Sequence, residues 1–157
     1  MNWEGFLREK GIDFEVIPHP ETYDAQHMAE ALHISGRHVA KTVLLRADRG
    51  FAYIVAVLPA PYRIDLQALS AAYGGSRLEL ATEQEIAERC PDCEFGVLPP
   101  FGSQYSLKTI VDKELTLDEW FVFEGSTHRE AVRMRWDDFQ RVEQPLVACF
   151  AVATQRA

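Results

Sequence analysis

The segment from Phe51 to Leu58 reads FAYIVAVL and is apolar on both of the faces that an extended chain presents. Successive side chains of a strand point to opposite sides of the sheet, so a strand of this kind is buried on both sides. It ends at the turn Pro59-Ala60-Pro61, where the prolines prevent the strand from continuing. The chain therefore needs a layer of structure on each side of one central strand.

A second apolar strand is predicted immediately before this one. Residues 39–46 read VAKTVLLR, and the two strands are expected to pair as a hairpin through Asp48-Arg49-Gly50. Because side chains alternate between faces, Lys41 is predicted to lie on the face that also carries Val39, Val43 and Leu45. A lysine is rarely well buried without a partner, so Lys41 is the first candidate for a functional residue.

Helix and strand patterns are interspersed along the rest of the chain, without strict βαβ alternation. Short helices are predicted over residues 2–10, 24–35, 65–73 and 82–90, and further strands over 12–17, 77–80, 107–111, 120–124, 131–136 and 147–152. These patterns predict a mixed α/β (α+β) fold, in which helices surround a curved, mixed, partly barrel-like β-sheet. A chain of 157 residues with 47% hydrophobic content is expected to form one domain, residues 1–157.

Charge and composition limit the class of partner. The chain has 24 acidic residues against 16 lysines and arginines, a net charge of -8, which is the wrong sign for a protein that coats a nucleic acid. A local contact with one end of a nucleic acid is compatible with this charge. The N-terminus shows no signal-peptide pattern and no apolar stretch is long enough to cross a membrane, so we expect a soluble, cytoplasmic protein without a membrane partner.

Two further segments carry residues suited to chemistry. Residues 96–102 read GVLPPFG, where prolines fix the backbone and glycines let a substrate approach amide N–H groups. His128 lies at the predicted end of a hairpin, and loops and strand ends are common places for functional side chains. Each candidate also has an ordinary structural interpretation: a lysine whose head group reaches the sheet edge, a rigid surface turn and a loop histidine.

The cysteines and the other histidines do not form a recognisable metal site. Residues 90–93 read CPDC, a single CxxC without a second pair, and it closes a helix, whereas a redox CxxC opens one. Cys149 makes the number of cysteines three, so we expect reduced thiols that pack as small apolar groups. No common nucleotide-binding or hydrolase motif is present. The remaining histidines are predicted to be structural or solvated: His19, His27, His33 and His38.

Taken together, VAKTVLLR, FGVLPPFG and FEGSTH resemble the YbaK/ProX family, the superfamily that includes the editing domain inserted in some bacterial prolyl-tRNA synthetases. The resemblance extends over nearly the whole chain. The order of elements is similar to the family's: an HP turn with a nearby tyrosine, the AKT lysine, an apolar strand, a DL helix, a GxxxP loop and a late Gly-x-x-His. In this chain these motifs contain His19, Pro20, Tyr23, Lys41, Gly96, Pro100, Gly125 and His128.

The resemblance implies a trans-editing deacylase, which hydrolyses the ester between a wrong amino acid and the 3′ adenosine of a tRNA in translation quality control. It implies that the catalytic residues are Lys41, Gly96, Pro100 and His128, with the lysine polarising the scissile end and loop amides holding the carbonyl or a water. No metal or cofactor takes part in the implied chemistry, and the terminal ribose hydroxyl is a candidate for assistance. The implied substrate-binding residues are Tyr23, Thr42, Val97, Leu98, Pro99, Phe101, Gly102, Gly125 and Thr127.

The implied partner is mischarged tRNA, bound by its 3′ aminoacyl-adenosine end, and an aminoacyl-tRNA synthetase is a second candidate partner. Two positions depart from the family pattern: Thr42 follows the lysine where alanine-editing members typically carry Asn, and Asp24 replaces a Thr common after the tyrosine. The choice among alanine, cysteine, serine and other small amino acids is therefore open, since small pockets discriminate weakly between similar side chains.

Two alternative functions are left open by the sequence. One is a non-catalytic module that binds aminoacyl-tRNA or a synthetase, and the other is hydrolysis of a small aminoacyl ester unrelated to tRNA. A catalytic site requires that Lys41, the loop from Gly96 to Pro100 and His128 converge on one pocket, because contact catalysis needs a reach of roughly 3 Å.

Overall fold

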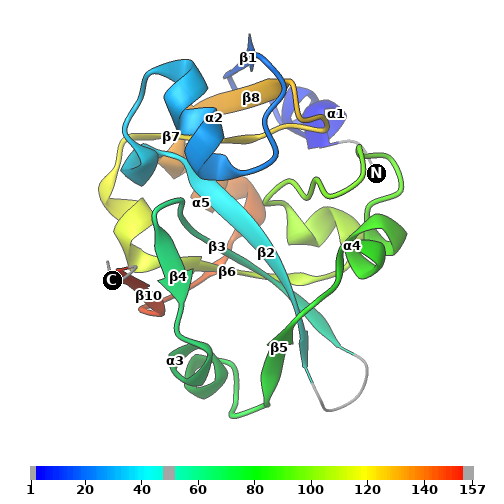
Figure 1. The fold of residues 1–157 in the computed structure, drawn as a ribbon, viewed down its shortest axis with the longest axis vertical. Coiled ribbons are helices and arrows are strands. Elements are labelled where there is room, and N and C mark those ends of the chain that lie inside the picture. The colour runs from blue at the N-terminus through cyan, green and yellow to red at the C-terminus, as the bar shows by residue number, and fades with distance from the viewer. Residues whose placement is uncertain (1–2, 48–51, 154–157) are drawn as a thin grey trace.

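A five-stranded mixed sheet runs through the middle of the molecule. The computed structural model describes residues 3–47 and 52–153 (Figure 1). The strand order is β5-β2-β3-β6-β9, with bounds Leu78–Leu80, Ala40–Ala47, Tyr53–Pro59, Lys108–Asp112 and Leu146–Ala148. β2 is antiparallel to β3 and β5, whereas β6 is parallel to β3 and β9. The apolar strand β3 is central in this sheet, as its sequence predicts.

Two smaller sheets complete the strand framework. β1 (Phe14–Pro18), β8 (Glu130–Arg135) and β7 (Trp120–Glu124) form an antiparallel sheet in the order β1-β8-β7, and β4 (Tyr62–Ile64) pairs with β10 (Ala151–Ala153). A parallel bridge between Val39 and Val122 joins the chain just before β2 to β7. The mixed α/β architecture is confirmed, although the sheets in the described ranges do not close into a barrel.

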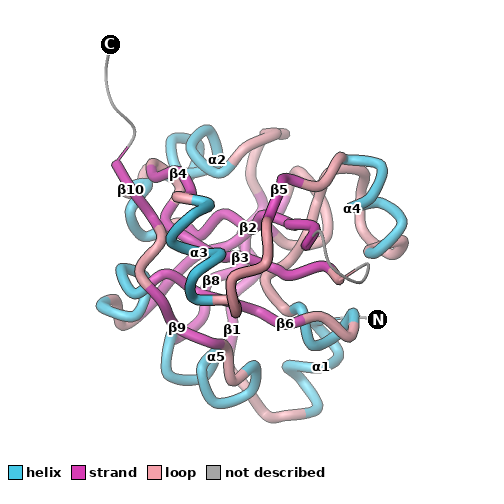
Figure 2. The backbone as a smooth tube through the Cα atoms, turned by 90° about the horizontal axis from the view of Figure 1, so that it is seen from below, coloured by secondary structure: helices cyan, strands magenta, loops and turns pink. Residues whose placement is uncertain are grey.

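Short helices surround these sheets, as Figure 2 shows. Three of them have side-chain N-caps, and the sequence predicts helices that start at these residues: Asp24, Asp65, and Thr82, which forms a capping box with Glu85. No helix in the described part of the chain has the length and apolar character needed to cross a membrane. The α-helices are α1 (Trp3–Glu9), α2 (Ala25–Leu32), α3 (Leu66–Ala72), α4 (Glu83–Arg89) and α5 (Trp136–Glu143), and the 3₁₀ helices are η1 (Gly36–His38), η2 (Gly102–Tyr105) and η3 (Lys113–Leu117).

Both faces of β3 are buried against different parts of the core. Val55 and Val57 belong to a large cluster rich in aromatic side chains, whereas Ile54, Ala56 and Leu58 belong to a second cluster that includes Leu69 of α3. Rings of the first cluster pack directly on one another, with centroids 5.2–6.3 Å apart, among Trp3, Phe6, Phe101, Phe121, Phe123, Trp136 and Phe139. This burial on both sides is what the FAYIVAVL segment requires.

The sequence-based prediction was wrong in two places near the C-terminus. Helix α5 was not predicted: its N-cap residue, Arg135, makes no side-chain capping bond, so the usual start signal is missing. The single strand expected over 147–152 is instead two short strands, β9 and β10, in different sheets. The hairpin pairing of β2 with β3 is confirmed, while its expected turn at residues 48–50 lies outside the described residues.

Candidate active site

His128 lies in the tight turn that joins β7 to β8. Gly125 opens this turn, and a β-carbon there would lie only 2.8 Å from Cγ of Glu130, so a side chain at this position would have to displace that of Glu130. The N–H of Ser126 donates a hydrogen bond to the Glu130 carboxylate at 3.1 Å, which fixes the turn further. The His128 ring is directed inward, and its side chain is only 7% exposed.

Both nitrogens of the His128 ring are engaged by protein groups. Nδ1 lies 2.9 Å from Oε1 of Glu124, and Nε2 lies 2.8 Å from the carbonyl oxygen of Phe95. A carbonyl oxygen only accepts hydrogen bonds, so Nε2 must carry a hydrogen for the second contact to be favourable. His128 is therefore a clamp between β7 and the loop that contains Phe95.

The first part of the glycine- and proline-rich loop is attached to the same turn through its backbone. The N–H of Glu94 donates to the carbonyl oxygen of Ser126 at 2.8 Å, and the N–H of His128 donates to Oε2 of Glu94 at 2.9 Å. Gly96 has φ +86°, a conformation that favours glycine, and a β-carbon there would lie 3.9 Å from the His128 ring. The Gly96 N–H donates to no other described residue, and Gly96 is partly exposed.

Lys41 is positioned by the contact between β2 and β7. Val39 and Val122 form the parallel bridge, and Lys41 and Glu124 each follow two residues later on the same face of their strands. Partial burial lowers the pKa of Lys41, while the negative charge of Asp24 opposes that shift. The structure thus places Lys41 and Glu124 on the same face of neighbouring strands, with Asp24 within electrostatic reach of both.

The electrostatics of the Glu124–His128 pair differ from those of ordinary surface groups. Burial raises the pKa of Glu124 to about 7; the contact with His128 opposes this shift, and the charges of Glu94 and Asp24 add to it. Burial alone would lower the pKa of His128, but its contacts with the Phe95 carbonyl and with Glu124 outweigh burial and raise it. Both pKa values are raised, and because the two groups contact each other, their titrations are coupled.

Other predicted substrate-binding residues lie at the edge of this cluster. The Tyr23 ring packs on His128 with centroids 4.7 Å apart and is 70% exposed, so its outer side is open to a ligand. Its hydroxyl donates to Oε1 of Glu21 at 2.6 Å. Thr127 caps the turn by accepting from the N–H of Arg129 at 3.2 Å, and Thr42 lies on β2 next to Lys41.

All of the predicted loop except Gly96 is in the core. Val97, Leu98 and Phe101 are at most 5% exposed, and Pro99, Pro100 and Gly102 are buried as well. Phe101 packs against Trp3, Phe6, Phe123 and Phe139. The buried residues 97–102 support residues 94–96, which lie at or near the surface. Residues 97–102 themselves are not presented at the surface.

Sequence reasoning missed three acidic members of this cluster: Asp24, Glu94 and Glu124. Asp24 was noticed only as a helix cap and as a departure from the family pattern. Glu124 ends a predicted strand, where a charged residue is ordinary, so nothing in the sequence distinguished it. Only the three-dimensional structure identifies all three residues, because it places their carboxylates within electrostatic reach of the buried His128 or the half-buried Lys41.

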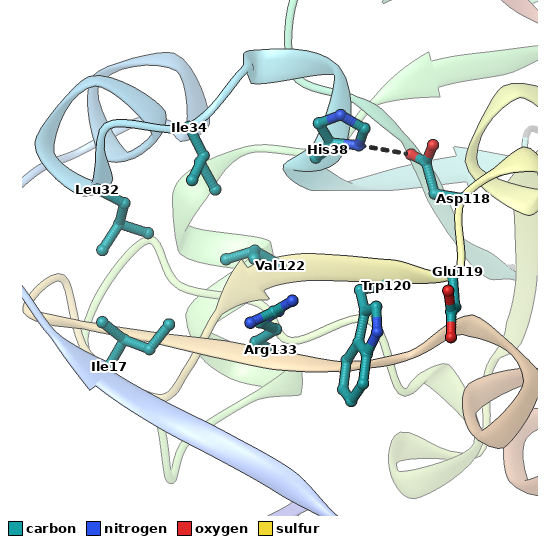
Figure 3. A pocket seen from close by; sticks show the side chains of 9 residues that line it. All are labelled: Ile17, Leu32, Ile34, His38, Asp118, Glu119, Trp120, Val122 and Arg133. Carbon is teal, nitrogen blue, oxygen red and sulfur yellow. Dashed lines mark ion pairs between the residues drawn. The ribbon is translucent and has the colours of Figure 1, made fainter.

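A separate hollow of about 520 Å³ lies between the end of α2, η1 and one face of the β1-β8-β7 sheet (Figure 3). Its charged groups are largely paired: Nδ1 of His38 lies 3.1 Å from Oδ2 of Asp118, and the Arg133 guanidinium lies 4.7 Å from the centroid of the Trp120 ring. The rest of the wall is mostly apolar, formed by Ile17, Leu32, Ile34 and Val122. The hollow therefore offers contact area rather than reactive groups.

The cysteine prediction needs a correction. Cys90 and Cys93 form a disulfide, whereas the sequence argument favoured free, reduced thiols. They are brought together where the chain turns after α4, and their sulfur atoms lie beside the hydroxyl of Tyr105. Cys149 is free and exposed, and therefore does not pack as a buried thiol.

Known proteins are similar to this chain in sequence and in fold. Residues 19–142 match the family described as aminoacyl-tRNA editing domain. The multifunctional Ser/Thr-tRNA deacylase ProXp-y of Escherichia coli (strain K12) is 28% identical over 148 residues, which cover 92% of this chain and 87% of that protein. A crystal structure of a proposed trans-editing enzyme for prolyl-tRNA synthetase superimposes with a TM-score of 0.82 at 22% identity, covering 96% of this chain and 95% of that one. Hypothetical protein APE2540 superimposes with a TM-score of 0.86 at 17% identity, covering 96% and 99%.

Proposed function

Because the chain belongs to the family of aminoacyl-tRNA editing domains, we propose that it is a stand-alone deacylase that hydrolyses the ester bond of mischarged aminoacyl-tRNA. The observation that carries this proposal is the cluster around His128. The Lys41 ammonium is half-buried, and the Gly96 N–H has no partner in the described part of the chain; both belong to the same group of neighbouring elements, as a site that stabilises a developing negative charge on an ester oxygen would need.

Each residue has a distinct role in the proposed reaction. The Gly96 N–H donates a hydrogen bond to the ester carbonyl oxygen, and the Lys41 ammonium binds and polarises the scissile end. A water oxygen forms a bond to the carbonyl carbon, and the bond from that carbon to the ribose oxygen breaks. One hydrogen of the water ends on the ribose oxygen, which leaves the free amino acid and an intact tRNA. His128 holds the loop in place.

The proposed substrates are tRNAs charged with small amino acids. Serine and threonine come first, because the Escherichia coli relative is named for these two, and alanine and cysteine remain candidates from the sequence. Tyr23 offers an exposed ring beside His128 on which the terminal adenine could stack. With a net charge of -8, contact is proposed to be limited to the 3′ end, with a synthetase as a candidate partner that delivers the tRNA.

A panel of mischarged tRNAs tests the proposal. The chain is incubated with tRNAs carrying serine, threonine, alanine or cysteine, and with simple esters of the same amino acids. We expect deacylation of at least one tRNA well above the spontaneous rate, and much slower cleavage of the simple ester. Binding without turnover would favour the non-catalytic alternative, and equal cleavage of tRNA and simple ester would favour an esterase unrelated to tRNA.

A further inference from the structure

We infer that Glu124 is a positioning residue of the editing site, which acts through His128 and the Phe95 carbonyl to orient the free N–H of Gly96. This inference deepens the proposed function and rests on it for its kinetic readout. Glu124 does not need to touch the substrate for this role. It determines which nitrogen of the histidine carries a hydrogen, and thereby whether the loop is held.

The link from His128 to Gly96 is the peptide bond between Phe95 and Gly96. In a planar trans peptide the C=O of one residue and the N–H of the next point in opposite directions. When Nε2–H of His128 holds the Phe95 oxygen at 2.8 Å, the Gly96 N–H must therefore point away from the histidine. Because the same N–H donates to none of the described residues, the clamp holds it ready for a ligand.

Counting hydrogens shows why the clamp needs a shared proton. The contacts at Nδ1 and Nε2 are both favourable if the ring is doubly protonated beside a carboxylate, or if a neutral ring accepts from a protonated Glu124. If that proton is lost, one hydrogen remains for two acceptors. A hydrogen bond to a carboxylate is stronger than one to a carbonyl, so the hydrogen moves to Nδ1 and the Phe95 carbonyl is released.

The charged groups around the pair come from several elements. Glu94, in the loop after α4, accepts from the His128 N–H, and Asp24 at the start of α2 acts on Glu124 through its charge. Tyr23 covers the outer side of the ring, and its hydroxyl is bonded to Glu21. The acidic groups favour retention of the shared proton, whereas the Lys41 ammonium on the neighbouring strand β2 opposes it. Burial and the acidic charges outweigh this opposition, since the pKa of Glu124 is raised, so the clamp should stay closed at neutral pH.

Two substitutions separate positioning from packing. In Glu124→Gln the amide N–H₂ can donate to Nδ1, so the neutral ring keeps its hydrogen on Nε2 at any pH. In Glu124→Ala no side chain at position 124 determines which nitrogen of the His128 ring carries the hydrogen. The matched control is Glu119→Gln, which removes a carboxylate that is 67% exposed just before β7 begins. For each variant, kcat/KM for tRNA deacylation is measured from about pH 6 to about pH 9 and corrected for spontaneous hydrolysis.

We expect Glu124→Ala to lower kcat/KM about 10- to 100-fold, since a displacement of roughly 1 Å at a contact group can cost about 10² in rate. Glu124→Gln should lie within about threefold of wild type near pH 6.5, and its rate relative to wild type should rise at least about fivefold by pH 9, as the wild-type clamp opens. Glu119→Gln should follow wild type throughout. A constant ratio of Glu124→Gln to wild type across the pH range, or near-normal turnover by folded Glu124→Ala, would overturn the inference.

A second readout is independent of activity. Long-range ¹H–¹⁵N spectra of the His128 ring report which nitrogen is protonated in each variant. We expect the hydrogen to leave Nε2 at high pH in wild type and to stay there in Glu124→Gln. If the wild-type ring keeps its Nε2 hydrogen when neutral, the inference fails. If the spectra behave as expected but no mischarged tRNA is hydrolysed, the proposed function fails and the control of His128 by Glu124 stands.

Discussion

The segment from Phe95 to Ser103 is anchored at both ends by a glutamate, buried Glu143 at one end and partly buried Glu124 acting through His128 at the other, and the two anchors use different kinds of donor. At the Ser103 end, the Glu143 carboxylate accepts from the N–H and the hydroxyl of Ser103 at 3.0 and 2.6 Å, and from the hydroxyl of Thr109 at 2.7 Å. At the Phe95 end, Glu124 faces a histidine that can itself gain or lose a proton. One anchor is fixed, and the other can be switched by protonation.

This comparison shows what a shifted pKa does and does not indicate. Burial raises the pKa of both glutamates, so the shift alone does not distinguish an active site from a structural bond. The partners do distinguish them. Neutral hydroxyl and amide donors at Glu143 leave nothing for a substrate, whereas the Glu124 end lies near a half-buried lysine and beside an unengaged backbone N–H.

The largest effect is expected at the Glu124 end, from Lys41→Ala. If the ammonium stabilises the reacting ester, its loss should lower deacylation on the order of 10² to 10³ fold, as for other single electrostatic stabilisers. Thermal stability should change little, because a half-buried ammonium with a lowered pKa contributes little to the folded state. The measurement is turnover of a mischarged tRNA together with thermal melting.

Lys108→Ala is the matched control, since Lys108 is an exposed strand lysine next to Thr109 at the other end of the segment. It should leave both turnover and melting temperature near those of wild type. A folded Lys41→Ala protein with normal turnover would mean that Lys41 is a structural residue, and the reactive end would have to be sought elsewhere.

The next effect is on stability, and it belongs to the Glu143 end. Glu143→Ala removes the acceptor of three donors; the Thr109 hydroxyl is buried, whereas the two donors of Ser103 are on an exposed residue, so the loss should cost about 2 kcal/mol. For a chain of this length that corresponds to a decrease in melting temperature of about 4 to 8 °C. Turnover per folded molecule should stay within about threefold of wild type. Glu143→Gln keeps an acceptor oxygen and should be the milder variant.

The contrast between the anchors would be lost if Glu143→Ala reduced turnover far more than stability. Activity must therefore be measured well below the melting temperature of the variant and divided by the folded fraction. A large loss of kcat/KM in fully folded protein would mean that the Ser103 end also positions the site.

The sequence predicts a structural feature well when that feature depends on residues that are neighbours along the chain. The bounds of β7 and the helix starts at Asp24, Asp65 and Thr82 depend on neighbouring residues, and the sequence predicts all of them. Both glutamate anchors join residues more than 30 positions apart through the loop, from Phe95 to His128 and from Ser103 to Glu143. No local pattern marks such contacts, so only the fold shows them.

The motifs predict the general location of the candidate site better than they predict its hydrogen bonds and the burial of its residues. Lys41, Gly96 and His128 come from motif positions, and their roles remain proposals. The motif treats residues 96–102 as one loop, but the structure divides it: Gly96 is near the surface, while Phe101 is fully buried among aromatic rings. Burial depends on α1 and α5, which are distant in sequence and, in the case of α5, lack a capping signal.

A smaller effect should appear in the pH dependence of stability. The pKa of Glu124 is raised to about 7 in the folded state, so stability decreases as the pH rises from about 4.5 towards 7. His128, whose pKa is also raised, contributes stability that is present below its unfolded pKa and lost as the pH rises through the folded one. Both groups act in the same direction.

The free energy of unfolding of wild type, relative to that of Glu124→Gln, should therefore fall by roughly 1–3 kcal/mol between about pH 5 and pH 8. Denaturant unfolding at several pH values measures this difference, and taking the difference cancels groups common to both proteins. Glu143→Gln serves as the comparison from the other anchor. A wild-type curve that runs parallel to that of Glu124→Gln would show that the pair does not share a proton.

The smallest effect is expected from chelation. In the described ranges, one group of three residues brings possible metal ligands within 4.8 Å of one another, namely Cys90, Asp92 and Cys93, and its two cysteines are joined by a disulfide. At the Glu124 end, the ligand atoms of His128 are held by Glu124 and by the Phe95 carbonyl. The proposed reaction relies on the Lys41 ammonium and a backbone amide, neither of which binds a metal ion as a ligand in that form. Deacylation should therefore stay within about twofold of its initial rate after exhaustive treatment with EDTA.

A stricter form of the chelation experiment adds a reductant, which frees the thiols of Cys90 and Cys93, and then compares wild type with Cys90→Ser. Loss of turnover that zinc restores in wild type, but not in Cys90→Ser, would mean that a metal bound four residues before Glu94 organises the switchable anchor.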